Sequence, residues 1–286
     1  MAPTARDLSP PVRLPRLEKV LLRDRLIVLF ALAAIIAISW RYLAVLAANM
    51  RSMSQMPMPM NMPGMAMPMN ANMSMNMPGM SMANETNFMS LFAMWSVMMV
   101  AMMLPSVTPN ILLVLGVYRR RGSRYTRAKS LLFIAGYLLA WTAFSAVAAA
   151  SQMLLHRAAL LTPEMAARSM FLAAMVLIVA GVYQWLPLKR ACLAHCHSPL
   201  GFLTRYWREG SSGAIGMGVR HGLFCVGCCW ALMALLFVAG VMNLLWIAAI
   251  AAFVLVEKLA PPALRLSRFA GIALAAWGAY LLAHIL

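Results

Sequence analysis

Acidic residues are scarce in this chain. Its 286 residues include 7 Asp and Glu against 24 Lys and Arg, for a formal net charge of +17. No acidic residue lies deep inside an apolar run, and Glu257 stands at the end of one. The chain also lacks a phosphate-binding loop, a nucleophile elbow and a dinucleotide fingerprint. These absences argue against active pumping by this chain alone. They also make an enzymatic function less favoured than a non-enzymatic one.

Long apolar runs dominate instead. Hydrophobic residues make up 63% of the sequence and charged residues 11%. The runs are about twenty residues long, the length that an α-helix needs to cross a bilayer. We therefore predict an all-α, polytopic transmembrane helix bundle in the lipid bilayer. The seven predicted spans are residues 26–48, 88–117, 131–154, 166–186, 217–239, 242–257 and 269–285.

The basic residues flank these runs and alternate between the two sides. Twenty of them precede the first span or lie in every second connection, and four lie on the other side. Under the positive-inside rule, this places the N-terminus in the cytoplasm and the C-terminus outside, in a bacterial inner membrane. The charge therefore indicates membrane topology and no nucleic-acid partner. The polar prefix, residues 1–25, fits an uncleaved anchor better than a signal peptide.

A methionine-rich linker, residues 49–87, separates the first span from a six-span domain, residues 88–286. The linker contains no Lys, His or Cys, and its Pro and Gly spacing predicts disorder. Thioethers bind Cu(I) in preference to hard ions, so the linker is a candidate outer capture segment. A neutral tether or an oxidant trap is the alternative. The candidate ligands in its two NMPGM repeats are Met62, Met65, Met67, Met77, Met80 and Met82.

A second set of methionines begins where the linker ends, inside the predicted span 88–117. Spacings of four residues place these side chains in two rows on a helix, so they can relay a soft ion. Plain core packing is the alternative, because Met fills irregular apolar gaps. The relay candidates are Met94, Met98, Met99, Met102 and Met103.

All five cysteines and three of the five histidines fall between residues 192 and 229, in two groups. The first group is Cys192, His195, Cys196 and His197. The second group is His221, Cys225, Cys228 and Cys229. Both groups are predicted at the cytoplasmic face, where they can meet and hold Cu(I), zinc or an iron–sulfur cluster. Since residues 228 and 229 differ by about 100° around a helix, we expect one of these two thiols to turn away from the site.

Three blocks of the sequence carry a resemblance. They are MWSVMMVAMMLPSVTP (94–109), YQWLPLKRACLAHCHSP (183–199) and GMGVRHGLFCVGCCWALMALLFVAGVMNLLW (216–246). The chain resembles a bacterial family of uncharacterised, predicted metal-binding integral membrane proteins. That resemblance implies a metal-ligand role for the Cys/His blocks. A looser similarity, in the Met-x-x-x-Met spacing of Met98 and Met102, is to copper uptake transporters that use a methionine ladder.

Three functions remain open from the sequence. The leading hypothesis is copper homeostasis, in which outer methionines collect Cu(I), the ladder passes it inward, and the Cys/His site holds it. Partners would then include a copper chaperone or membrane metalloenzyme subunits, and an oligomer is compatible. The second hypothesis is a membrane oxidoreductase or a subunit of one, which uses the thiols or their metal. The third is a structural subunit that zinc stabilises.

Overall fold

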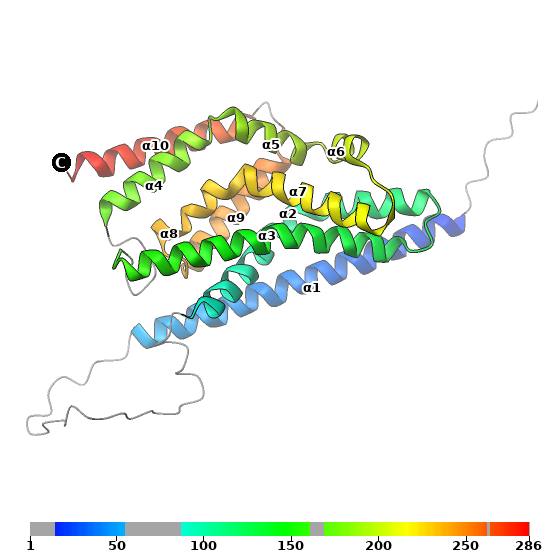
Figure 1. The fold of residues 1–286 in the computed structure, drawn as a ribbon, viewed down its shortest axis with the longest axis horizontal. Helices are drawn as coiled ribbons and strands as arrows, with labels where there is room; N and C mark the ends of the chain where they lie inside the picture. Colours follow the sequence, from blue (N-terminus) through cyan, green and yellow to red (C-terminus); the bar gives the residue numbers. More distant parts are fainter. Residues whose placement is uncertain (1–14, 55–86, 161–168, 262–263, 286) are drawn as a thin grey trace, which may run out of the picture.

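The computed structural model describes residues 15–54, 87–160, 169–261 and 264–285, which form helices and no strand (Figure 1). This confirms the all-α class. The helices are α1 (Pro15–Ser54), α2 (Phe88–Arg120), α3 (Thr126–Arg157), α4 (Met170–Tyr183), α5 (Pro187–His197), α6 (Pro199–Tyr206), α7 (Gly210–Ala234), α8 (Leu236–Ala239), α9 (Leu244–Leu259) and α10 (Leu266–Ala283). The six candidate capture methionines, residues 62 to 82, lie outside the described residues.

Fewer helices than seven have the length and apolarity of a membrane span. Five segments of the described chain meet both conditions: Leu22–Asn49, Phe88–Arg120, Thr126–Arg157, Gly210–Ala239 and Leu266–Ala283. A sixth is possible if α4 and α5, which meet at a bend of 63°, count as one span. The predicted span 242–257 corresponds to α9, whose 16 residues are short for a full crossing. The seven-span count therefore stays a prediction.

The centre of the bundle is α3, which packs along both α2 and α7. Small residues on α7 allow this close approach. A Cβ atom placed on Gly222 would lie 2.7 Å from Cβ of Ala140 on α3, so a larger residue there would push the two helices apart. Prolines at positions 105 and 109 interrupt the backbone ladder of α2, yet the helix continues through both.

At one edge of the bundle, α4 and α10 run side by side (Figure 1). Their contact is again built on glycine, because a Cβ atom on Gly181 would lie 2.7 Å from the backbone N of Ala275. The buried residues of α10 are Gly271 and Gly278, and four of its large apolar side chains are exposed: Phe269, Ile272, Trp277 and Tyr280. An apolar helix that buries so little protein surface is suited to contact with lipid.

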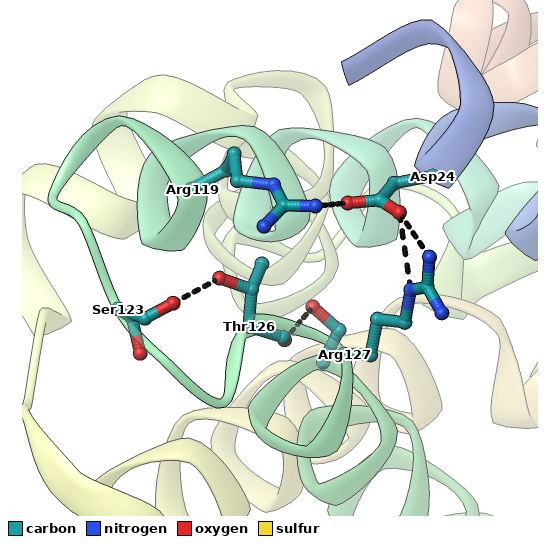
Figure 2. A network of polar contacts seen from close by, with 6 residues as sticks. Asp24, Arg119, Ser123, Thr126 and Arg127 are labelled. Carbon is teal, nitrogen blue, oxygen red and sulfur yellow. Dashed lines mark hydrogen bonds and ion pairs between the residues drawn. The ribbon is translucent and has the colours of Figure 1, made fainter. Parts of the chain in front are cut away.

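The long helix α1 is fastened to the bundle by one buried carboxylate. Figure 2 shows Asp24 between two arginines of the α2–α3 turn. Its carboxylate pairs with the guanidinium of Arg119 and with that of Arg127 at 2.6 Å. Thr126 closes the same turn by donating to the carbonyl of Ser123 at 2.8 Å. The start of α1 and the basic α2–α3 turn therefore lie at the same end of the bundle.

A second ion pair adds the α6–α7 connection to that end, because Arg121 lies 2.9 Å from Glu209. Three segments that charge counting assigned to one side of the membrane are thus neighbours in space. This agrees with the predicted alternation of the helices. Which side of the membrane this end faces remains a prediction.

The chain between α4 and α7 forms two short helices, and each begins at a proline, α5 at Pro187 and α6 at Pro199. The aromatic residues that follow Pro199 pack into the bundle. Phe202 is buried with its ring 4.9 Å from the ring of His221, and Trp207 lies 4.8 Å from Tyr118. Burial of these aromatic side chains removes apolar surface from solvent, and this favours the contact of α6 with α2.

Candidate metal site

The five relay candidates lie on α2 and are all buried. Their side chains are 0–4% exposed, and they belong to the main apolar core. Between residues 94 and 103, α2 therefore turns its methionines into the bundle, and none of these five thioethers faces lipid. Burial is what both a relay and core packing require, so position alone does not separate the two interpretations. The five side chains are those of Met94, Met98, Met99, Met102 and Met103.

Four of the five cysteine thiols gather where α5 meets α7. The side chain of Cys228 interacts with the thiols of Cys196, Cys225 and Cys229. These four residues are buried, and all of them are unpaired thiols. The two sequence groups therefore do meet, as predicted, and the contact is made by sulfur. We call these four residues the thiol cluster.

Cys192 lies at the border of the thiol cluster and is half-buried. A Cβ atom on Gly227 would be 2.8 Å from its sulfur, so glycine at this position lets the two helices approach. Cys228 and Cys229 both direct their thiols to the carbonyl of Cys225, at 3.1 and 3.0 Å. Thiols three and four residues along a helix can share one carbonyl acceptor, although they differ by about 100° around it. Which of the two would stay outside a metal's ligand set remains a prediction.

A closed ring of hydrogen bonds joins the thiol cluster to the methionine helix. Tyr137 of α3 lies 3.1 Å from the sulfur of Cys225 and donates to the carbonyl of Met103 at 3.3 Å. Ser106 donates to the same carbonyl at 2.9 Å. Lys258 of α9 donates to Ser106 at 3.0 Å and to the sulfur of Cys225 at 2.9 Å. Four helices thus meet at one buried polar ring, which holds Cys225 in place.

The three histidine candidates lie in separate settings. His221 is buried and its Nε2 atom is 2.6 Å from the amide nitrogen of Asn110, while Nδ1 has no partner among the described residues. His195 stacks on Phe224 at 4.1 Å, and its Nδ1 atom is 2.8 Å from its own helix carbonyl at Ala191. The structure therefore engages both imidazoles in contacts other than with sulfur.

His197 lines a cavity of about 290 Å³ between α5, α9 and α10, away from the thiols. Beside this cavity, Lys189 donates to the carboxylate of Glu257 at 2.6 Å and also to Gln184. Ser267 of α10 donates to the same carboxylate. Glu257 stands near the end of α9, and it is buried in an ion pair with Lys189 that the hydroxyl of Ser267 also joins.

Sequence reasoning missed three residues of the ring. Lys258 was counted as a flanking positive charge, although an ionisable residue at the end of an apolar run is a site candidate by default. Tyr137 and Ser106 carry no local signal, because only the packing of α2 and α3 against α7 brings them to Cys225. The thiols also lie more than halfway along α7, which starts at Gly210 and not at the predicted residue 217.

Among the described residues, no three His, Cys, Asp or Glu side chains are arranged as a ready metal-binding group. The chemistry of the thiol cluster is nevertheless specific. Thiolates select ions such as Cu(I) and Zn(II). An ion that requires three or more of these ligands would need a rearrangement here.

Fold and site together define a polytopic helical membrane protein with a buried cluster of soft sulfur donors. Residues 92–281 match the model of a family described as PpoB2, copper chaperone, and the chain belongs to this family. The matched region includes the methionine helix, the ring and the thiol cluster, but not α1 or the methionine-rich linker. No curated protein and no solved structure gave a significant match.

Proposed function

We propose that this protein carries Cu(I) across the interior of its helix bundle and holds it at the thiol cluster. The observation that carries the proposal is the ring at Tyr137, whose hydroxyl joins the backbone carbonyl of Met103 on α2 to the sulfur of Cys225 on α7. The last methionine candidate of α2 is therefore separated from a thiol of the cluster by one tyrosine hydroxyl. Membership in a copper chaperone family supports copper as the cargo.

The direction of transfer follows from the donors. Neutral thioethers bind Cu(I) weakly, whereas thiolates carry charge and bind it more tightly. Cu(I) therefore moves downhill from the methionine linker, along the two methionine rows of α2, to the thiol cluster. With the predicted orientation, this transfer runs inward, and an accepting partner such as a copper chaperone or a metalloenzyme subunit would complete it.

The thiol cluster is tested by metal analysis of the solubilised full chain under reducing conditions. Wild type is compared with a variant in which Cys225, Cys228 and Cys229 are all replaced by Ser. We expect near-stoichiometric Cu(I) in the wild type and its loss in the variant. Equal copper in the two proteins would refute the assignment. Zinc in place of copper in the wild type would favour the structural alternative.

The methionine row is tested separately, by Cu(I) uptake into vesicles that contain the reconstituted protein. The double substitution Met98→Leu and Met102→Leu keeps the volume of the core but removes two thioethers. We expect uptake to slow about tenfold, because each relay step then lacks a soft donor. The matched control is Met217→Leu with Met233→Leu, two buried methionines of α7 outside the row. If both doubles slow uptake equally, the row is core packing.

A further inference from the structure

Lys258 is a buried cation with no carboxylate partner among the described residues. The neighbouring carboxylate, that of Glu257, is occupied by Lys189 and Ser267. The ammonium group of Lys258 instead contacts the sulfur of Cys225 and the hydroxyl of Ser106. A buried charge is costly without a counter-charge, so the arrangement calls for negative charge on the thiols.

We propose that Lys258 is a specificity-determining residue, which selects a monovalent over a divalent cation at the thiol cluster through its fixed positive charge. This inference rests on the proposed function, since it concerns the ion held by the same thiols. It adds a reason why a thiol cluster of this kind would hold Cu(I) and reject Zn(II), which also favours thiolates.

Charge counting gives the first argument. Two thiolates, one ammonium group and one Cu(I) ion sum to zero, whereas the same set with Zn(II) keeps one net positive charge. A neutral assembly is far less costly in a low-dielectric interior than a charged one. Cancelling that charge would require a third thiolate to ionise in the buried cluster, a cost that a Cu(I) complex does not meet. The groups that face Lys258 are Ser106, Tyr137, Cys196, His221, Cys225, Cys228 and Cys229.

Distance gives the second argument. The ammonium nitrogen is 2.9 Å from the sulfur of Cys225. A metal–sulfur bond is about 2.3 Å long, so a bound ion lies within about 5 Å of that nitrogen. At this separation, each unit of metal charge is repelled by enough to weaken binding about 100-fold, at an effective dielectric constant of about 20. This repulsion acts on two units of charge in a divalent ion and on one unit in a monovalent ion.

The test measures the affinities of the solubilised full chain for Cu(I) and for Zn(II), each by competition with a chromogenic chelator under reducing conditions. In Lys258→Gln, the ratio of the two affinities should shift about 100-fold toward Zn(II). Lys258→Leu is a second neutral variant, which avoids a buried polar group and gives no new sulfur ligand. It should shift the ratio in the same direction.

Two controls isolate the charge. Lys258→Arg keeps a cation and Ser106→Ala keeps the lysine while removing its second contact, so both should retain the wild-type ratio within a few-fold. A ratio that stays unchanged in both neutral variants would overturn the proposal, as would an equal shift in the arginine variant. Failure of the proposed function looks different, because the wild type itself would then bind no Cu(I).

Discussion

Lys189 and Lys258 are both buried lysines, yet their surroundings differ. Lys189 is 0% exposed and lies 2.6 Å from a carboxylate that α9 supplies. Lys258 is 7% exposed and lies 2.9 Å from a cysteine sulfur. The positive charge of Lys189 is balanced by the carboxylate of Glu257. The positive charge of Lys258 would be balanced only by ionised thiols. The role of a buried lysine therefore depends on its partner. Lys189 links helices through Glu257, whereas Lys258 contacts a candidate metal ligand.

The largest effect on stability is expected when the positive charge of Lys189 is removed. In Lys189→Met, Glu257 stays buried without its counter-charge, which should lower the free energy of unfolding by about 3–5 kcal/mol. Reversible unfolding in mixed micelles measures this loss. The ratio of Cu(I) to Zn(II) affinity should not change in the folded fraction, because Lys189 does not contact the thiols.

A double variant controls that result. Adding Glu257→Gln to Lys189→Met removes the uncompensated charge, so most of the lost stability should return. If the double variant were as unstable as the single one, packing of the lysine stem and not charge would be the cause. The contrast between Lys189 and Lys258 would then lose its electrostatic basis.

A smaller effect is expected when the ring is opened without changing its charge. Tyr137→Phe removes one hydroxyl from the contacts with Met103 and Cys225, which should cost about 1–2 kcal/mol of stability. The ratio of Cu(I) to Zn(II) affinity should remain near that of the wild type, since Lys258 is intact. Chelator competition and unfolding are measured on the same preparation.

Tyr183→Phe is the matched control, because that hydroxyl donates to a backbone carbonyl of α7, that of Gly227, and makes no hydrogen bond to Cys225. It should lose similar stability. A shift in the affinity ratio of Tyr137→Phe as large as that of Lys258→Gln would show that hydrogen bonding, and not fixed charge, sets ion selectivity.

The smallest effect is expected for an exposed pair at the basic end of the bundle. Arg121 and Glu209 are both largely exposed, at a separation of 2.9 Å. Water and salt screen such pairs, so Glu209→Gln should change the free energy of unfolding by about 0–1 kcal/mol. Unfolding in mixed micelles at low and high salt checks this value. A loss as large as that of Lys189→Met would mean that burial does not explain the difference between ion pairs.

Part of the site was predictable because its residues are unusual in sequence. The cysteine groups and the methionines of α2 stood out by composition and spacing, and the structure brings the cysteine groups together. The histidines were predicted with the same logic, but His195 and His221 have partners other than thiols. Ring nitrogens accept several kinds of neighbour, so spacing alone does not identify their partner.

Hydropathy predicted where helices occur better than how they are used. The apolar windows of α1 and α2 have mean hydropathies of 2.2 and 1.9, but 17% of the first window is buried against 56% of the second. The more apolar helix is therefore the more peripheral one. Hydropathy measures transfer from water to lipid or protein alike, so it does not distinguish a central helix from one that faces lipid.

The sequence by itself determined the helical class, the alternation of charged ends and the presence of soft sulfur donors, because these depend on composition and local periodicity. Tertiary structure alone decided that Tyr137, Ser106 and Lys258 meet Cys225, and that Glu257 pairs with Lys189. These contacts join residues on different helices, and no local pattern encodes them. Their geometry exists only because glycine-lined helices pack closely enough to exclude lipid from the polar ring.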